Sequence, residues 1–343
     1  MGGGRTAVTL RDVAQHAGVS PRTVSNVVND FHHVSPAMRA KVQAALDELN
    51  YRPNLLARGL RQGRTGIISV LLPQIAVPYF GELAHEIVER AGQLGFTVQV
   101  DETGGRPEQE LRLLDVASHS QRVDGILLSS QGLYHQALAD LRTAVPVVLL
   151  GERTAANHDH VGIDNVAAAL EATTHLLAAG RTRIGAVGGL DSRSDVTSEL
   201  RLKGYRAALH RAGLPLDPAL HAPTPDYSRA QGTVGARALL ALADPPDALV
   251  CLSDDLAAGA LRELHDQGLR VPDDVSVVGF DDVDASRFCV PSLSSVAPDK
   301  AAIASTALEM LIDRVGGSSG PPRDVRVEHR LVSRESSAVR ASC

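Results

Sequence analysis

Residues 9–28 read TLRDVAQHAGVSPRTVSNVV. Thr9 can cap a first helix, apolar residues then recur at helical spacing, and Gly18 can end that helix. Ser20 can cap a second helix, with Pro21 in its first turn, where a missing N–H group costs nothing. The stretch therefore predicts two short helices that are joined by a tight turn.

The second of these helices is a candidate reader of DNA bases. In a helix-turn-helix the second helix lies in the major groove, and its first residues meet the base edges. Pro21, Arg22 and Asn26 are the exposed early positions; arginine can bond guanine, and asparagine adenine, through two hydrogen bonds. The hydroxyl groups of Thr23 and Ser25 suit phosphates. On geometry alone, any other small three-helix module remains an alternative.

Charge of one sign is concentrated at one end of the chain. The 343 residues carry a formal net charge of −6 at pH 7. Residues 1–65 hold nine Lys/Arg and four Asp/Glu, a net charge of +5, so the remaining residues carry −11. A basic head on an acidic body suggests that only the head approaches a polyanion. A terminus that is basic by chance is the alternative.

The head continues with one more amphipathic segment and a linker. Apolar residues at helical spacing predict a third helix over residues 35–50. Pro53 breaks this helix, and residues 54–60 can form a short fourth helix before a linker at 62–64. The head is therefore expected to be all-α.

From Gly66 onward, apolar runs alternate with helical stretches. The expected strands are residues 67–72, 96–100, 125–128, 147–150, 184–187, 248–252, 276–279 and 325–331. Buried strands separated by helices are typical of parallel sheets that are covered on both faces. Two such series predict two doubly wound lobes, with a ligand cleft at the facing carboxyl ends of their strands.

The quoted residues and others along the chain resemble the lac repressor (LacI/GalR) family. In the head the matching segments are 9–14, 18–20, 23–25, 28–29, 49–54 and 57–60. In the body they are 124–126, 164–165, 204–205, 253–255 and 277–282. They follow the family order from residue 9 to about residue 335, so the resemblance spans nearly the whole chain.

The family resemblance implies a small all-α helix-turn-helix domain followed by an α/β region. That region consists of two doubly wound parallel-sheet lobes resembling periplasmic binding proteins. The expected domains are 1–53 for DNA binding, 54–65 for a hinge helix and linker, 66–162 with about 292–320 for the first lobe, and 163–291 with about 321–343 for the second lobe.

The resemblance also implies a homodimer whose recognition helices read two half-sites of a near-palindromic double-stranded operator. The hinge helix would fold on DNA and insert Leu60 into the minor groove as an apolar wedge. Without the resemblance, Leu60 is a lone linker leucine, and His32 is equally well an ordinary solvated histidine. The expected DNA contacts are Thr9, Pro21, Arg22, Thr23, Ser25, Asn26, His32, Asn54, Ala57 and Leu60.

A small-molecule effector is the second partner that the resemblance implies. The expected ligand-binding residues are Tyr79, Phe80, Thr197, Arg201, Tyr227, Asp254 and Asp281. The aromatic rings would cover a ligand ring, and the two aspartates would accept bonds from neighbouring hydroxyls. Phe280 is read as core packing or as part of the cleft. Gly151 departs from the family where relatives place an acid, and Ser253 stands where others have asparagine.

Composition argues against other classes of protein. Hydrophobic residues make up 44% and charged residues 22%, an ordinary globular composition. No apolar run approaches the roughly 18 residues of a membrane span, and the first ten residues lack the apolar stretch of a secretory signal. The three cysteines have neither metal-site spacing nor the even count of a disulfide framework. We expect a cytoplasmic protein with no membrane contact.

Motifs for catalysis are not apparent either. Residues 185–189 lack the G-x-G-x-x-G spacing of a dinucleotide turn, and residues 158–160 are read as a polar loop rather than a metal site. We expect no cofactor, no metal and no enzyme activity. After Glu335 eight residues remain, without leucine heptads, so a dimer is expected rather than a tetramer.

The sequence thus predicts a transcriptional regulator, most simply a repressor, whose operator affinity is controlled by a sugar or sugar derivative. The alternative is a cytoplasmic small-molecule-binding protein or enzyme of the same α/β class that does not bind DNA. A secreted sugar-binding protein is opposed by the basic head and by the residues at the N-terminus.

Overall fold

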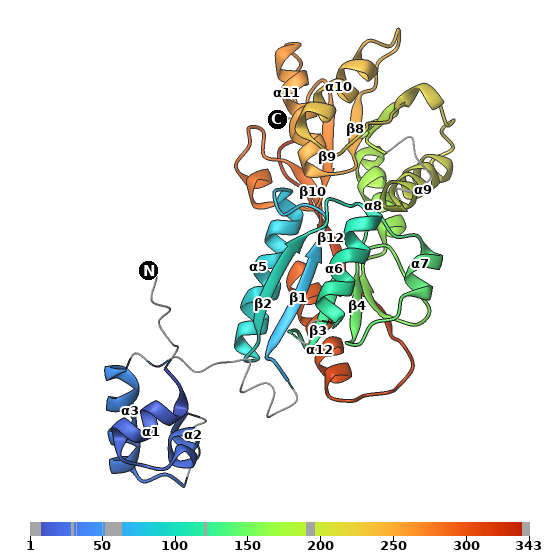
Figure 1. The fold of residues 1–343 in the computed structure, drawn as a ribbon. Coiled ribbons are helices and arrows are strands. Elements are labelled where there is room, and N and C mark those ends of the chain that lie inside the picture. Colours follow the sequence, from blue (N-terminus) through green and yellow to red (C-terminus); the bar gives the residue numbers. More distant parts are fainter. Residues whose placement is uncertain are drawn as a thin grey trace, which may run out of the picture. The chain divides into compact units, whose positions relative to one another are not determined.

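The computed structural model consists of two compact units, Met1–Thr65 and Gly66–Cys343 (Figure 1). The residues whose structure is described are 8–28, 31, 33–49, 51, 64–119, 122–189 and 196–337. No helix in these ranges is both long enough and apolar enough to span a bilayer.

The first unit is all-α, as expected. Its helices are α1 (Leu10–Ala17), α2 (Pro21–Val28) and α3 (Pro36–Glu48). A capping box begins α1, because the Thr9 hydroxyl accepts from the Asp12 N–H and the Asp12 carboxylate accepts from the Thr9 N–H. Gly18 ends α1 in the left-handed conformation, with φ of 59°. One fully buried valine from each helix makes the core: Val13, Val24 and Val42. The fourth helix expected over residues 54–60 lies outside the described residues.

The second unit contains two six-stranded sheets. The first sheet has the order β11-β5-β4-β3-β1-β2, with all neighbours parallel. Its strands are β1 (Ile67–Leu72), β2 (Thr97–Glu102), β3 (Gly125–Leu128), β4 (Val147–Leu150), β5 (Asp159–Gly162) and β11 (Asp324–Arg326). Two helices pack together on one face, α5 (Pro78–Gln93) and α12 (Lys300–Val315). The other face packs against α6 (Pro107–His119) and α7 (His135–Asp140).

The second sheet has the order β12-β10-β9-β8-β6-β7, and only β12 runs antiparallel to its neighbour within it. Its strands are β6 (Ile184–Val187), β7 (His221–Ala222), β8 (Ala248–Cys251), β9 (Ser276–Phe280), β10 (Ser294–Pro298) and β12 (His329–Val332). Helices pack in two pairs, α8 (Asn165–Ala178) with α9 (Val196–Arg211), and α10 (Arg229–Leu240) with α11 (Asp254–Asp266). Two short 3₁₀ helices are η1 (Pro218–Leu220) and η2 (Asp284–Arg287). The expected pair of doubly wound lobes is confirmed.

The boundaries expected between the lobes differ from those in the structure. The segment near 292–320 was assigned to the first lobe, yet β10 pairs with β9 in the second sheet. The segment from about 321 was assigned to the second lobe, yet β11 pairs with β5 in the first sheet. The single strand expected over 325–331 is two strands, β11 and β12, because the chain leaves one sheet and joins the other between them. The chain therefore passes between the lobes three times.

The sequence suggests a polar loop at residues 158–160, but two of these three residues lie in a strand. Asp159 and His160 begin the buried strand β5. The Asp159 carboxylate receives hydrogen bonds from Arg314 and Arg323, between 2.7 and 3.0 Å. Both ring nitrogens of His160 face acceptors, with Nδ1 2.7 Å from Asp324 Oδ1 and Nε2 2.6 Å from the carbonyl oxygen of Gly151. Polar residues are tolerated in this strand because other segments supply their partners.

Candidate functional site

The surface of α2 carries the residues expected to read DNA. Pro21 and Arg22 are exposed, Asn26 is half-buried, and Val24 on the opposite side is buried in the core. Thr23 and Ser25 are half-buried. The Thr23 N–H donates to Ser20 Oγ at 3.1 Å, so the beginning of α2 is capped as the sequence predicted.

The remaining expected DNA contacts divide into two groups. Thr9 is exposed, and its hydroxyl caps α1 by accepting from the Asp12 N–H at 3.4 Å while it donates to the Asp12 carboxylate at 2.7 Å. The others lie outside the described residues: His32, Asn54, Ala57 and Leu60.

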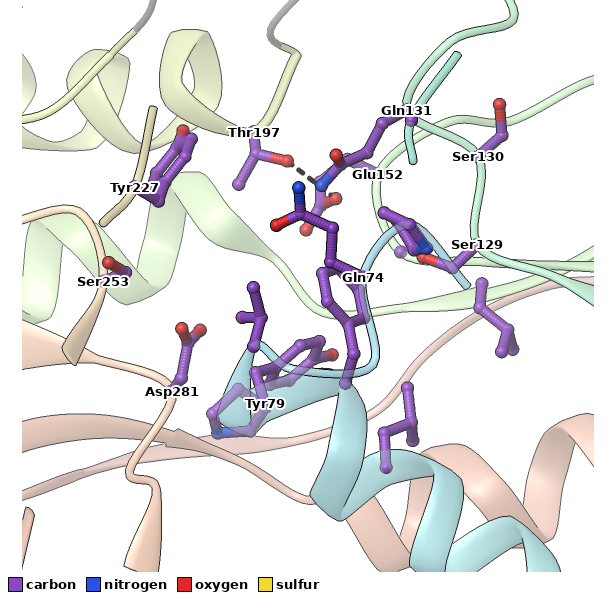
Figure 2. A pocket seen from close by; sticks show the side chains of 18 of the residues that line it. Gln74, Tyr79, Ser129, Ser130, Gln131, Glu152, Thr197, Tyr227, Ser253 and Asp281 are labelled. Atoms are coloured by element: carbon purple, nitrogen blue, oxygen red, sulfur yellow. Dashed lines mark hydrogen bonds between the residues drawn. The ribbon is translucent and has the colours of Figure 1, made fainter. Parts of the chain in front are cut away.

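A cavity of about 330 Å³ lies between the two lobes of the second unit (Figure 2). Its walls include loops that follow β1, β3 and β4 of the first sheet, together with residues of α9 and of the loop after β9 in the second. Six of the seven residues expected to bind the effector line it: Tyr79, Phe80, Thr197, Arg201, Tyr227 and Asp281. The facing ends of the two sheets thus form the cleft that the strand pattern predicted.

Arg201 is buried in the cavity wall, and its guanidinium group has several partners within the protein. Its Nε donates to Asn165 Oδ1 at 2.8 Å, and Nη1 donates to the carbonyl oxygen of Leu252. Its Nη2 lies 3.5 Å from Asp281 Oδ1, and its Cζ lies 3.5 Å from the centroid of the Phe280 ring. Phe280 itself is buried in the core, so the core interpretation of this residue holds and its ring supports the arginine.

Asp281 presents the carboxylate that faces the cavity. It is 8% exposed, and burial raises its pKa to about 7, although the nearby Arg201 guanidinium acts to lower that pKa. Burial also raises the pKa of Tyr79, which lines the same cavity. An uncharged and a charged form of Asp281 are therefore both accessible near neutral pH.

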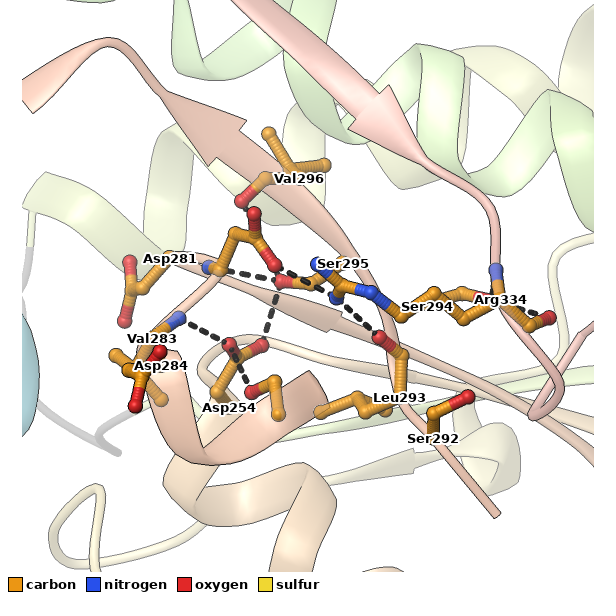
Figure 3. Close-up of polar contacts among 12 residues, drawn as sticks. Asp254, Asp281, Val283, Asp284, Ser292, Leu293, Ser294, Ser295, Val296 and Arg334 are labelled. Atoms are coloured by element: carbon orange, nitrogen blue, oxygen red, sulfur yellow. Dashed lines mark hydrogen bonds and ion pairs between the residues drawn. The ribbon is translucent and has the colours of Figure 1, made fainter. Parts of the chain in front are cut away.

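Asp254 does not line the cavity, so the sequence-based assignment of this residue to ligand binding is wrong in position. Its carboxylate accepts from the Val283 N–H at 2.9 Å, from Ser286 Oγ at 2.7 Å and from Ser295 Oγ at 2.6 Å (Figure 3). Burial raises its pKa to about 6. Asp254 thus fixes the segment that follows β9, because two of these three donors belong to that segment and the third lies on the adjacent strand β10.

Glu152 is a cavity residue that the sequence analysis missed. The family resemblance implies an acid at position 151, where this chain has Gly151, and the structure has an acid in the cavity wall one residue later. Glu152 Oε2 accepts from Thr197 Oγ1 at 2.9 Å (Figure 2). Its Oε1 accepts from Asn165 Nδ2 at 3.0 Å. The signal was present, because this acid follows the apolar run of β4 at a strand end.

The loop at residues 129–133 supplies further polar lining and was also missed. The buried Glu110 carboxylate accepts from Ser130 Oγ at 2.6 Å and from the Gln131 N–H at 2.9 Å. Arg153 donates to the carbonyl oxygens of Leu133 at 2.8 Å and Gln131 at 2.7 Å. Both the donors and the acceptors of the loop are thus fixed before a ligand arrives.

Comparison with known proteins decides the family. Residues 9–54 match the bacterial regulatory proteins of the lacI family, and residues 173–337 match a periplasmic binding protein-like domain. The HTH-type transcriptional repressor CytR of Escherichia coli (strain K12) is 33% identical over 314 residues, which cover 91% of this chain and 91% of that protein. The chain belongs to the lacI family.

Two solved structures of transcriptional regulators match over nearly the whole chain. The lac repressor dimer bound to operator and the anti-inducer ONPF is 30% identical, with a TM-score of 0.82, and the match covers 97% of this chain and 99% of that one. The transcriptional regulator CelR in complex with cellobiose is 31% identical, with a TM-score of 0.71, and the match covers 96% and 99% of the two chains. This lacI-family regulator therefore combines a DNA-binding domain with a ligand-binding domain.

Proposed function

We propose that this lacI-family regulator is a homodimeric repressor whose affinity for a near-palindromic operator is set by a neutral, hydroxyl-rich effector. The effector is a sugar or sugar derivative and binds in the interlobe cavity. One observation carries the proposal: the chain joins a helix-turn-helix unit with an exposed Arg22 to a cavity whose walls come from both lobes.

Charge and exposure support operator binding by the first unit. Its net charge of +5 contrasts with −11 for the rest of the chain, and attraction to phosphates provides most of the affinity of a protein for DNA. Arg22 and Asn26 lie on α2 at the positions from which a recognition helix meets bases. The matched lac repressor structure is a dimer on operator DNA. The contacts expected from His32, Asn54, Ala57 and Leu60 belong to the same proposal.

The charges around the cavity support a neutral effector. The buried cations Arg201 and Arg153 both donate to groups of the protein, while Glu152, Asp281 and Asp255 add acidic lining. A phosphate or carboxylate would therefore meet acids, and the two lining arginines already have acceptors within the protein, so they would offset its desolvation less. Hydroxyl groups can donate to Glu152 and Asp281, and the rings of Tyr79 and Tyr227 can cover an apolar ring face. The matched CelR structure holds cellobiose.

The division of the cavity between two lobes supports regulation by the effector. A ligand that contacts Tyr79 in the first lobe and Asp281 in the second favours the lobe arrangement in which both contacts exist. In the homodimer, this arrangement would set the spacing of the two hinge segments at residues 54–65. Coupling free energies between two sites of this kind are typically about 1–3 kcal/mol.

A DNA-binding assay and a ligand-binding assay test the proposed function. Anisotropy of a labelled duplex library should show binding that weakens steeply between about 50 and 200 mM salt and that is lost when residues 1–60 are deleted. Thermal-shift assays should show stabilisation by at least one of D-ribose, D-glucose, cellobiose and adenosine, but not by glucose 6-phosphate. Ligand binding without DNA binding would instead support the alternative of a small-molecule-binding protein, and turnover of the ligand would support an enzyme.

A further inference from the structure

The turn that follows β9 places Asp281 in the cavity through an unusual backbone conformation. Asp281 has a φ of 111° and Asp282 a φ of 44°, and within the described ranges these are the two non-glycine residues with positive φ. This region is sparsely populated by L-residues and persists only where surrounding contacts hold it. The orientation of the Asp281 carboxylate therefore depends on whatever holds the turn.

Contacts within the second lobe hold three N–H groups of the turn. The Asp281 N–H donates to the carbonyl oxygen of Val296 at 2.8 Å. The Asp282 N–H donates to Ser295 Oγ at 3.0 Å. The Val283 N–H donates to the Asp254 carboxylate (Figure 3). These contacts remain whatever the position of the first lobe.

The Asp282 carboxylate pairs with Arg334 of the second lobe at 2.6 Å, and two side chains of the first lobe contact the backbone of the turn. Lys300 Nζ donates to the carbonyl oxygens of Asp281 at 2.6 Å and Asp282 at 3.1 Å. The same Nζ lies 2.9 Å from Glu82 Oε2, and Glu82 Oε1 accepts from the Asp284 N–H at 2.8 Å. Both carbonyls of the left-handed residues thus rely on one cation, which approaches from the opposite lobe.

The position of Lys300 in its helix does not explain why a lysine stands there, whereas its contact with the turn does. Lys300 is the first residue of α12, where the positive end of the helix dipole disfavours a cation. Its side chain is only 12% exposed, so its charge is withdrawn from water. The helix α12 packs on α5, which carries both Glu82 and the cavity residue Tyr79. Glu82 therefore belongs to the first lobe, and Lys300 begins a first-lobe helix two residues after the second-lobe strand β10 ends.

We propose that Lys300 and Glu82 are positioning residues that couple the effector-binding carboxylate of Asp281 to the arrangement of the lobes. The turn keeps its left-handed conformation while both first-lobe side chains are in contact, and it relaxes when the lobes separate. An effector that bonds Asp281 then stabilises the engaged arrangement even though it does not touch Lys300. This inference rests on the proposed function, because it assigns Asp281 to effector binding.

Hydrogen exchange tests the coupling without any ligand. In the full-length protein, Lys300→Met should increase amide exchange across residues 281–284 by at least about tenfold, whereas Lys300→Arg, which keeps the charge and donors, should restore protection. Lys203→Met is the matched control, because Lys203 is exposed on α9. Glu82→Gln, which keeps an acceptor for the Asp284 N–H, should give a smaller increase and guards against a folding failure of Lys300→Met. Unchanged exchange in both Lys300→Met and Glu82→Gln would overturn the inference.

A ligand titration separates this inference from the proposed function. With D-ribose, D-glucose, cellobiose and adenosine as probes, Lys300→Met should weaken binding by about tenfold and Lys203→Met should not. Equal affinities of Lys300→Met and the unaltered protein for a probe that binds would also overturn the inference. Failure of all four probes to bind would contradict the proposed effector class, and the exchange experiment would still decide the coupling.

Discussion

Oε2 of Glu152, at the end of β4 in the first lobe, accepts a hydrogen bond from Oγ1 of Thr197, on α9 of the second lobe, at 2.9 Å. The two lobes are therefore joined across the cavity by side chains that also line it. A hydroxyl-bearing ligand can replace either partner, because Glu152 accepts and Thr197 can do both.

Thr197→Val tests the contribution of this interlobe bond. The variant keeps the shape of the side chain and removes the donor, so the free energy of unfolding should fall by roughly 0.5–1.5 kcal/mol in urea denaturation. Glu152→Gln is the comparison variant, because it retains an acceptor oxygen and should lose less. A Thr197→Val protein as stable as the unaltered one would mean that the bond contributes nothing in solution.

The raised pKa of Asp281 predicts a pH dependence with a definite sign. The folded pKa of about 7 exceeds the unfolded value of 3.8, so the folded state binds the extra proton between these values. The free energy of unfolding should therefore fall as pH rises from about 4 to 7, by at most about 1.4 kcal/mol per unit for this group. Urea denaturation of Asp281→Asn should show a smaller fall between pH 5 and pH 7 than the unaltered protein.

The same titration should appear in effector binding. Ligand hydroxyls donate best to an ionised carboxylate, so the affinity for a neutral sugar should increase as pH rises through about 7, and Asp281→Asn should abolish this increase. Calorimetric titrations at pH 6 and pH 8 measure it. A pH-independent affinity would mean that Asp281 does not contact the ligand.

Arg201→Ala should abolish the response to effector while operator binding without effector survives. The guanidinium contacts both Asn165 and the cavity residue Asp281, so its removal disorders the site rather than α2. Because its loss also leaves buried polar partners unpaired, unfolding should become easier by about 3–5 kcal/mol. Arg206→Ala, exposed on the same helix, is the control for operator anisotropy with and without effector. An intact response in Arg201→Ala would contradict the assignment of the cavity.

Arg22→Ala should relax base preference at one position of each half-site by roughly 1–3 kcal/mol. The exposed Lys41 offers a contrast, since a residue that contacts only phosphate weakens binding to all sequences alike. Competition binding over single-base operator variants measures the difference. Unchanged discrimination in Arg22→Ala would mean that another residue of the first unit reads the base.

Asp159→Asn should destabilise the second unit strongly. Burial acts to raise the pKa of Asp159, but hydrogen bonds from Arg314 and Arg323 outweigh it and lower the pKa to about 2. Removal of the charge weakens the hydrogen bonds from both arginines, and because Arg323 is partly exposed and keeps its contact with Asp313, the free energy of unfolding should fall by about 1–3 kcal/mol. Thermal unfolding should register the loss, and Asp313→Asn, which removes only the exposed partner of Arg323, should have a much smaller effect.

Strands that are apolar on both faces could be predicted from the sequence to the residue, and β1 (Ile67–Leu72) is an example. The strand β5 (Asp159–Gly162) could not, because the partners that make its polar residues tolerable lie more than 150 positions away. Residues 325–331 read as one strand for a related reason. The strand propensity of individual residues does not show where an extended segment leaves one sheet and joins another.

The residues of the candidate site also fall into those that the sequence predicted and those that only the fold shows. The family resemblance indicated Tyr79 and Asp281, and both follow strands whose carboxyl ends face the cleft. Asp254 and Glu152 also follow strands. Only the fold shows that the Asp254 carboxylate bonds to a turn and that Glu152 lines the cavity. Lys300 had no local signal, because its role depends on a contact between two lobes.

The three passages of the chain between the lobes also constrain how the molecule is made. β10, α12, β11 and β12 all come from the final fifth of the residues, and they complete both sheets. During synthesis neither sheet has all of its strands until these elements have left the ribosome, whereas α1 to α3 can pack earlier. A nascent chain therefore has its three-helix head long before the cavity between the lobes can form.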